Sequence, residues 1–297
     1  SVGLLKKRGC KILAKTNGGY KYEGGGGISA GAISARLDDS PRGEIIVLDE
    51  VKSTNDYLKD LAERGENVCA VIAKKQSGGR GRHGNGFLSG RGGLYLSYYL
   101  PLSRPAQDCT ALTCAAGVCV LHAVARACGA HAGIKWVNDP VIDGKKICGI
   151  LTERMPAPAK APLSRLILGI GINVSSAPFS GELALRATTL EQQGYPCALT
   201  ALAEALIREL DEMARRFEAG KEAVYFPEYR QHCVTLGKEI RILSYRGGAE
   251  KTARAVGLTE DYGLRVVFPD GAEDVLRSGE VRVRGLGGYV GEAPQGR

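Results

Sequence analysis

Residues 68–86 read VCAVIAKKQSGGRGRHGNG and join an apolar run directly to a basic, glycine-rich one. The first six residues contain no polar side chain, which is typical of a short buried strand. The stretch 76–86 then holds five glycines, two arginines and one histidine. Because glycine lacks a Cβ and tolerates positive φ, successive amides of such a loop can approach an anion closely. The pattern predicts an anion-binding loop, a solvated surface loop or a nucleic-acid tether of the RGG type.

The polar side chains of this loop are suited to an anion. Arg80 and Arg82 are separated by one glycine and could reach the same anion, and the Gln76 amide can donate and accept hydrogen bonds at the strand end. An RGG tether usually occurs as repeats in a low-complexity tract, whereas this stretch lies inside a region that reads as folded. From the loop alone, a solvated basic loop remains an equal alternative.

Strand-like and helix-like segments alternate on both sides of the loop. Ser53-Thr54-Asn55 is typical of a helix N-cap, and residues 198–220 repeat their apolar positions with the 3.6-residue period of an amphipathic helix. A further helix is expected from Pro105 to Cys128. Strands are expected at 43–50, 67–75, 93–100, 134–139, 145–154 and 165–174. This order predicts an α/β (α+β) fold, a mixed β-sheet flanked by helices.

The two ends of the chain differ from its middle in their sequence pattern. From Gly237 onward, short strands separated by Gly, Asp and Pro turns predict a small β-barrel, followed by a loose tail. Near the start, Asn17-Gly18 between two alternating runs predicts a β-hairpin, with a flexible glycine joint at 24–27 and a short helix at 28–37. We therefore expect four parts, 1–38, 39–235, 236–285 and the tail 286–297.

The N-terminal hairpin carries most of the positive charge. Residues 1–36 contain seven basic side chains against Glu23 alone, which accounts for +6 of the net charge of +8. A basic hairpin of this kind resembles the wing of a winged helix-turn-helix domain whose recognition helix would precede it. DNA binding is therefore expected only of a form with the complete helix-turn-helix. The basic residues are Lys6, Lys7, Arg8, Lys11, Lys15, Lys21 and Arg36.

Composition excludes several classes of protein. With 297 residues and 44% apolar content the chain can bury a large core, and we find neither a signal peptide nor a run of about 18 to 20 apolar residues for a membrane span. The nine cysteines form no CxxC pair, which predicts reduced thiols, a cytoplasmic location and no thiol-based metal site.

Common catalytic and nucleotide motifs are absent or out of context. The chain has no GxxxxGK[ST] sequence, and GIGIN at 169–173 lacks the third glycine of a dinucleotide-binding fingerprint. Residues 27–31 match GxSxG around Ser29, but they follow four glycines instead of a core strand. We therefore expect no nucleophile at Ser29.

Three further motifs follow downstream: KWVND at 135–139, KKICGIL at 145–151 and GIGINV at 169–174. Taken singly, the first two are better explained without a function, with Trp136 in the core, the lysines on the solvated surface and Asn138-Asp139-Pro140 in a turn. Together with STN at 53–55 and QSGGRGRHG at 76–84, however, their order resembles the biotin–protein ligases, which activate biotin with ATP and attach it to a lysine of a carrier protein. The resemblance covers about residues 40–285. Phe87, Gly90 and Val137 depart from it, standing where the family has tryptophan, proline and proline.

The resemblance implies a fold, ligands and site residues. It implies a catalytic domain like those of class II synthetases and biotin–lipoate ligases, an SH3-like C-terminal domain, and ATP and Mg²⁺ as cofactors with no metal ligands assigned. Biotin would contact Ser53, Thr54, Asn55, Gln76, Arg80, Gly81, Arg82, Lys146, Gly149 and Leu151. ATP would contact Arg82, Phe87, Asn138 and Asn173, and the catalytic groups would be Arg80, Arg82, Lys146 and Asp139.

The implied partners follow from the same resemblance. They are biotin and the biotin carboxyl carrier domain of a carboxylase, no membrane partner is expected, and a homodimer is left open. Two alternatives remain: a biotin-sensing repressor in the full-length form, and a lipoate or octanoyl ligase of the same fold.

The implied chemistry explains the residue types. A carboxylate must attack the α-phosphorus of ATP, so two anions must approach each other. A cation about 4 Å from a unit negative charge contributes about 4 kcal/mol at an effective dielectric of about 20, less its own desolvation cost. Fixing the two reactants in line contributes about 7 to 11 kcal/mol more. A glycine loop that orders over the product, biotinyl-5′-AMP, would exclude water from a reactive anhydride.

Overall fold

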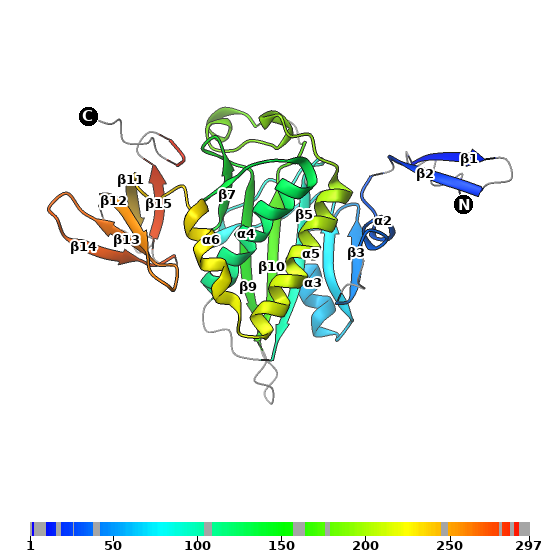
Figure 1. The fold of residues 1–297 in the computed structure, drawn as a ribbon, viewed down its shortest axis with the longest axis horizontal. Helices are drawn as coiled ribbons and strands as arrows, with labels where there is room; N and C mark the ends of the chain where they lie inside the picture. Colours follow the sequence, from blue (N-terminus) through cyan, green and yellow to red (C-terminus); the bar gives the residue numbers. More distant parts are fainter. Residues whose placement is uncertain are drawn as a thin grey trace.

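A computed structural model describes residues 2, 10–15, 19–25, 27–37, 42–103, 109–156, 164–175, 179–244, 249–278, 281–285 and 288–290. Three parts follow one another across the molecule: a separate N-terminal hairpin, a central body of helices and strands, and a C-terminal β-domain (Figure 1). The division of the chain into domains at the expected boundaries remains a prediction.

The central body is built on a five-stranded sheet. Its order is β3 (Glu44–Leu48), β4 (Val68–Ala73), β5 (Leu94–Leu102), β10 (Ser164–Ile172) and β9 (Cys148–Met155). β3 and β4 are parallel, and the remaining neighbours are antiparallel. The predicted mixed sheet is therefore confirmed, with strand ends that differ from the expected ones by a few residues.

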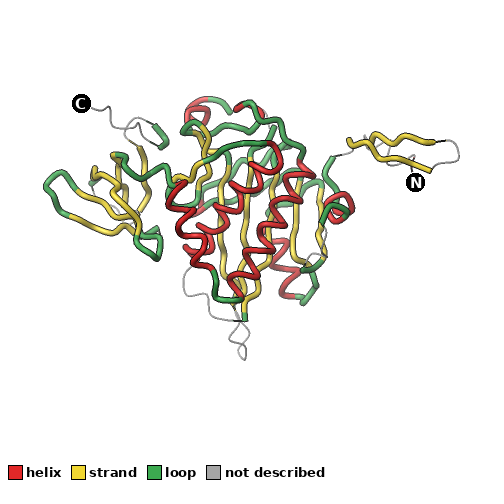
Figure 2. The backbone as a smooth tube through the Cα atoms, in the orientation of Figure 1, coloured by secondary structure: helices red, strands yellow, loops and turns green. Residues whose placement is uncertain are grey.

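Helices cover the two faces of this sheet unequally. On one face lie α4 (Cys109–Cys128), α5 (Leu199–Glu218) and α6 (Tyr225–His232), as Figure 2 shows. On the other face lies α3 (Thr54–Glu63), whose Leu58 and Leu61 pack against Val71 of β4 and Ile167 of β10. The residues adjacent to Val71 and Ile167 along the strands point to the opposite face of the sheet, into the larger core. Because α3 is short, the upper part of this second face stays uncovered by any helix.

The helix α4 is long and apolar enough, by length and composition alone, to span a membrane, although Thr113, His122 and Arg126 interrupt its apolar run. Two thirds of the residues in its most apolar stretch are buried, and the helix packs between the sheet, α5 and α6. We therefore interpret α4 as the core helix of the body. The expected start of this helix, Pro105, lies outside the described residues.

A small three-stranded sheet adjoins the upper end of the body. It contains β6 (Gly133–Lys135), β7 (Asp139–Ile142) and β8 (Lys145–Lys146), all antiparallel. Asp143 and Gly144 form the turn between β7 and β8, both with positive φ. Short 3₁₀ turns complete the body: η1 (Arg82–Gly84), η2 (Gly181–Leu185), η3 (Glu191–Gln193) and η4 (Glu222–Val224).

The C-terminal domain is an antiparallel sheet, consistent with the expected SH3-like domain. Its order is β14 (Glu273–Leu276), β13 (Leu264–Val267), β12 (Lys251–Leu258), β11 (Glu239–Ser244) and β15 (Val281–Gly285). The expectation of a loose tail is wrong for residues 288–290, because the Val290 side chain is buried and Tyr289 contacts the body. Residues 291–297 lie outside the described residues.

The N-terminal hairpin is confirmed. It pairs β1 (Cys10–Lys15) with β2 (Gly19–Gly25), and the turn residues Asn17 and Gly18 lie outside the described residues. β2 continues through Gly25, so the expected joint at 24–27 is partly strand. Ser29 caps the short helix α2 (Ala30–Ser34) by accepting a hydrogen bond from Ala32 N, as expected of a residue without a catalytic role. DNA contact by the hairpin remains a prediction.

One histidine links three helices of the body. His122 on α4 lies with Nδ1 3.0 Å from Glu209 Oε2 on α5, and its Nε2 contacts Glu228 on α6. The hydrogen bond with Glu209 raises the pKa of His122, burial opposes it, and Glu228 adds to the rise, giving a pKa of about 9. The imidazolium is therefore the form that the fold favours.

The stability of the body should depend on pH through His122. Since the folded-state pKa lies above the usual 6.5, the stabilisation should be complete below about pH 6.5 and lost as the pH rises through about 9. We expect His122→Gln to destabilise by about 1 kcal/mol at pH 6.5, or about 2 °C in Tm, after allowing for solvent screening of a partly exposed side chain. Thermal unfolding of both proteins from pH 6 to 10 measures this. A difference in Tm that does not shrink with rising pH would contradict it.

Candidate active site

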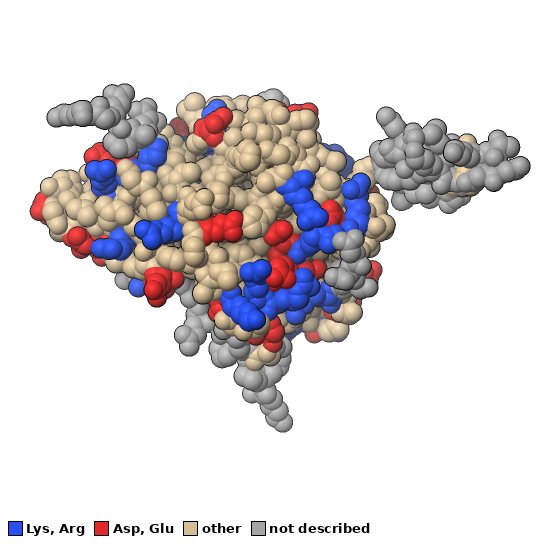
Figure 3. All heavy atoms as spheres, viewed as in Figure 1, with Lys and Arg blue, Asp and Glu red and all other residues tan. Residues whose placement is uncertain are grey.

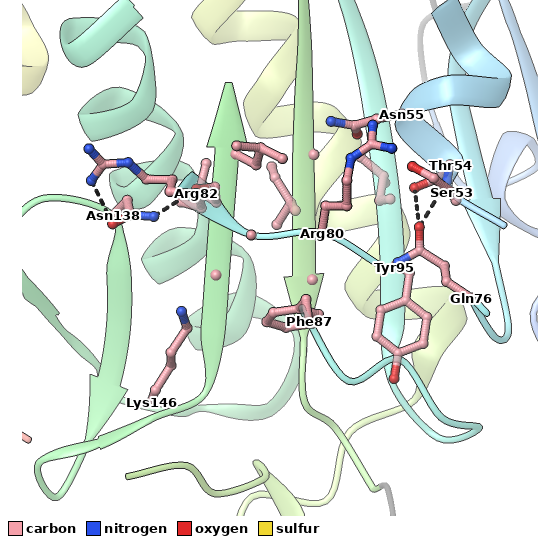
Figure 4. Close-up of a pocket in the computed structure, with 18 residues that line it drawn as sticks. Ser53, Thr54, Asn55, Gln76, Arg80, Arg82, Phe87, Tyr95, Asn138 and Lys146 are labelled. Carbon is pink, nitrogen blue, oxygen red and sulfur yellow. Dashed lines mark hydrogen bonds between the residues drawn. The ribbon is translucent and has the colours of Figure 1, made fainter. Parts of the chain in front are cut away.

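A pocket occupies the uncovered upper face of the central sheet. The strands contribute Tyr95, Leu96, Gly149, Ile150, Leu151, Gly169, Ile170 and Gly171, and the adjoining segments contribute Ser53, Thr54, Asn55, Gln76, Arg80, Gly81, Arg82, Phe87, Asn138 and Lys146 (Figure 4). Leu96, Ile150 and Ile170 also belong to the main core, because successive side chains of a strand point to opposite faces of the sheet. Except for Asp139 and Asn173, every site residue expected from the sequence lines this pocket.

The N-terminus of α3 forms one wall of the pocket. Ser53 is the N-cap and its hydroxyl accepts a hydrogen bond from Asp56 N. The Gln76 side-chain oxygen accepts from Thr54 N at 2.8 Å and from the Thr54 hydroxyl at 3.0 Å, while its amide nitrogen donates to Ser89 Oγ. Gln76 therefore ties the start of the glycine loop to the helix end, using its donor and acceptor together.

Behind this wall lies a buried polar cluster that the sequence did not reveal. The hydroxyl of Ser97, a fully buried residue of β5, lies 2.7 Å from Thr54 Oγ1 and 2.5 Å from Asn55 Oδ1. The Asn55 amide donates to Glu153 Oε2 at 2.6 Å. Because buried polar groups are costly without partners, this cluster fixes the orientation of Thr54 and Asn55.

Glu153 is also a counter-ion for the glycine loop. Its other oxygen lies 2.7 Å from Lys59 Nζ and 3.7 Å from the Arg80 guanidinium. Arg80 itself makes a two-pronged pair with Asp56, with Nη1 2.6 Å from Oδ2 and Nη2 bonded to Oδ1. Hydrogen bonding to Arg80 lowers the pKa of Asp56, although burial opposes this. Arg80 is therefore held as a cation at the pocket wall.

Arg82 turns the opposite way from Arg80. Its guanidinium donates to the Ser278 carbonyl oxygen of the C-terminal domain and lies 3.4 Å from Asn138 Oδ1. Figure 4 shows the two arginines on opposite sides of the pocket. Each guanidinium pairs with an acceptor of the protein, so the expectation that both bind one anion stays a prediction.

Lys146 is the third cation of the pocket. Its Nζ lies 2.5 Å from Asp139 Oδ1, and Asp139 Oδ2 accepts a hydrogen bond from the Tyr289 hydroxyl. Burial alone would raise the pKa of Asp139, but the charges of Lys146 and Lys135 and the hydrogen bonds from Lys146 and Tyr289 outweigh it and lower that pKa. Asp139 is thus a buried carboxylate that orients Lys146 at the pocket edge.

Glycines form the floor of the pocket. Gly149 and Gly171 lie directly opposite each other on β9 and β10, and the Phe87 ring rests on them. A Cβ at Gly171 would overlap the ring, and one at Gly149 would lie 3.0 Å from both Phe87 Cε2 and Lys146 Nζ. The ring narrows the cavity to about 60 Å³, which is room for a few water molecules.

A second hollow adjoins the first. It has a volume of about 400 Å³ and shares Gly81, Arg82, Phe87, Asn138 and Lys146 with the pocket. Its remaining lining comes from both domains and includes three basic side chains and two aromatic ones, which are Lys135, Arg186, Arg284, Trp136 and Tyr289. Such a hollow suits a polyanion with a flat ring.

Two expected site residues occupy other positions. Asn173 does not line the pocket: it is buried, and its amide donates to the Thr188 carbonyl at 3.1 Å and lies 3.5 Å from the Lys146 carbonyl. It therefore braces the backbone behind Lys146 and lines neither hollow, so its contact with the nucleotide stays a prediction. Asp139 lines the second hollow, one layer behind Lys146.

Comparison with known proteins shows which family this chain resembles. Residues 47–173 match the family model described as Biotin/lipoate A/B protein ligase family. A biotin–[acetyl-CoA-carboxylase] ligase of Mycobacterium tuberculosis is 30% identical over 262 residues, covering 86% of this chain and 91% of that protein. A bifunctional ligase/repressor of Bacillus subtilis is 35% identical over 194 residues, or 63% of this chain, and the match spans 59% of that relative.

Solved structures agree. A biotin protein ligase from Aquifex aeolicus, in complex with biotin and ATP, superposes with a TM-score of 0.67 at 30% identity, covering 81% of this chain and 98% of that one. The overall fold is thus similar to that of this enzyme, and the chain belongs to the biotin/lipoate A/B protein ligase family.

Proposed function

We propose that the protein attaches biotin to a lysine of a biotin carboxyl carrier domain, using ATP and passing through biotinyl-5′-AMP. The observation that carries the proposal is the pair of adjoining hollows that share Lys146, the first of which is the pocket in Figure 4. Apart from its three cations, the first hollow is lined by uncharged hydrogen-bonding side chains and a glycine floor, which suits a compact, uncharged ring system with polar edges. The second is basic, which suits a nucleoside triphosphate.

Lys146 would act where the two ligands meet. The carboxylate of biotin must approach the α-phosphorus of ATP, and a cation about 4 Å from each anion reduces their repulsion by about 4 kcal/mol at an effective dielectric of about 20. Asp139 holds the ammonium at this position before either ligand arrives. A cation that is already in place needs no reorganisation during the reaction, which is how fixed charges lower a barrier.

The glycine loop would supply the remaining positive charge. Arg80 and Arg82 now bind Asp56 and the Ser278 carbonyl, so ligand anions would compete with these internal acceptors. Each exchange replaces one charge-assisted hydrogen bond by another, so the cost of reorienting the arginines is small. The loop would then lie over the adenylate and exclude water from it.

Magnesium would enter with the nucleotide. Mg²⁺ keeps several waters and is usually bound by nucleotide phosphates with one or two carboxylates. The described part of the chain contains no group of three or more His, Cys, Asp or Glu side chains that could hold a metal alone. Asp139 fits a contact through water, since Lys146 and Tyr289 already engage its oxygens. The ion would neutralise phosphate charge when bound.

Lipoate is the alternative acid substrate, since the matching family model includes lipoate ligases. The Thr54–Gln76–Ser97 network makes one wall of the pocket polar, and this favours biotin, whose ring has polar edges, over an apolar dithiolane ring or alkyl chain. A long alkyl chain would make no hydrogen bonds with this wall.

A cytoplasmic location and a homodimer remain predictions.

The purified protein with Mg²⁺ should catalyse exchange of pyrophosphate with ATP in the presence of biotin. Lipoate or octanoate should support at least about 100-fold less exchange, because an apolar ring or chain makes no hydrogen bonds with the polar wall of the pocket. Radiolabelled pyrophosphate exchange measures this, and mass spectrometry of the retained ligand should identify biotinyl-5′-AMP. Exchange that is independent of biotin would overturn the proposal.

Lys146→Ala should lower adenylate formation about 100- to 1000-fold, the usual effect of removing one fixed charge at a reacting centre. Lys145→Ala is the matched control, since Lys145 is the adjacent residue of β8 and does not line either hollow. Single-turnover formation of biotinyl-5′-AMP measures both variants, and thermal unfolding checks the fold. Equal activity of the two variants would exclude the role given to Lys146.

Gly171→Ala should raise the KM for biotin at least about tenfold, because a Cβ would overlap the Phe87 ring and obstruct the pocket floor. Gly90→Ala is the control, because a Cβ at this loop position meets no atom within 4 Å. Steady-state exchange at varied biotin concentrations separates KM from kcat. An unchanged KM in the Gly171 variant would mean that biotin does not lie on the glycine floor.

A further inference from the structure

Tyr289 is placed by the C-terminal domain against the catalytic body. Its ring centroid lies 4.3 Å from Lys135 Nζ and 5.3 Å from the Arg284 guanidinium carbon. Lys135 is only 5% exposed and its ammonium also donates to the Val283 carbonyl at 2.9 Å. Cations on an aromatic ring are attracted to it, so β15, Lys135 and Tyr289 form one packed unit.

The hydroxyl of Tyr289 points to the carboxylate behind Lys146. It donates to Asp139 Oδ2, while Asp139 Oδ1 lies 2.5 Å from Lys146 Nζ. The Asp139 side chain is 13% exposed, so it has little water to replace a lost partner. A carboxylate held by a hydroxyl on one oxygen and an ammonium on the other has its plane fixed.

We infer that Tyr289 is a positioning residue for the ligation reaction: its hydroxyl fixes Asp139, and Asp139 in turn fixes Lys146 between the two hollows. This rests on the proposed function for its catalytic consequence. Lys146 lines both hollows, whereas Tyr289 and Asp139 line only the second. The C-terminal domain thus contributes to the geometry of a lysine that belongs to the body, and docking of that domain sets where the ammonium lies.

The first experiment is a comparison of Tyr289→Phe with the wild-type protein. The variant keeps the ring between its cations and removes only the hydroxyl. We expect kcat of biotin-dependent pyrophosphate exchange to fall about tenfold, the size of one charge-assisted hydrogen bond, with the KM for biotin unchanged within about twofold. Tyr225→Phe removes a hydroxyl from the buried face of α6 and should leave both constants unchanged.

A double-mutant cycle tests the route through Asp139. If Tyr289 acts through Asp139, Tyr289→Phe should have no further effect in an Asp139→Ala background. In an Arg80→Lys background its effect should be undiminished, because Arg80 pairs with Asp56 on the opposite wall. A merely structural role for Tyr289 would instead lower Tm and give additive losses in both backgrounds.

A ligand-free measurement separates this inference from the proposed function. The rate at which acetic anhydride modifies Lys146, followed by mass spectrometry of peptides, reports how firmly the ammonium is held. We expect modification to be several-fold faster in Tyr289→Phe and unchanged in Tyr225→Phe, with Lys145 as the internal reference. Equal Lys146 rates in all three proteins would overturn the inference, even if the wild type is active. Absence of exchange in the wild type would overturn only the proposed function.

Discussion

The site depends on one electrostatic constraint: three cations lie around one pocket and each must have a partner while no ligand is bound. Arg80 forms an ion pair with Asp56, Arg82 donates a hydrogen bond to the Ser278 carbonyl oxygen, and Lys146 forms an ion pair with Asp139. Without these partners, mutual repulsion and desolvation would disfavour the folded loop. The internal acceptors thus keep the charges close to the position in which anionic ligands would need them.

The three partners differ in how easily they can be exchanged. The Arg80–Asp56 pair is partly exposed, and a main-chain carbonyl is a weaker acceptor than a phosphate, so both arginines can change partners at little cost. Asp139 is buried and is also bonded to Tyr289, so its pair with Lys146 is the more permanent one. The two arginines are therefore the mobile charges of the site, and Lys146 is the fixed one.

Much of this could be predicted from the sequence, and the failures have identifiable causes. The periodicity of the apolar residues predicted the sheet and the helices, and the order of the short motifs predicted that Ser53, Gln76 and Lys146 lie at one site. Pairing choices were not predictable: nothing local shows that Arg80 and Arg82 turn apart, because their acceptors lie at Asp56 and Ser278, far along the chain. The buried position of Asn173 was not predictable either, because an amide that braces a loop has the same local sequence as one that binds a ligand.

The alternation along β9 has a consequence for how the site tolerates change. Gly149, Leu151 and Glu153 face the pocket and its wall, while Ile150 points into the main core. A single inserted or deleted residue in this strand would exchange the two sets, placing a carboxylate among aliphatic side chains and a bulky group on the glycine floor. Evolution can therefore change the length of the surrounding loops, whereas it can change β9 only by substituting residues.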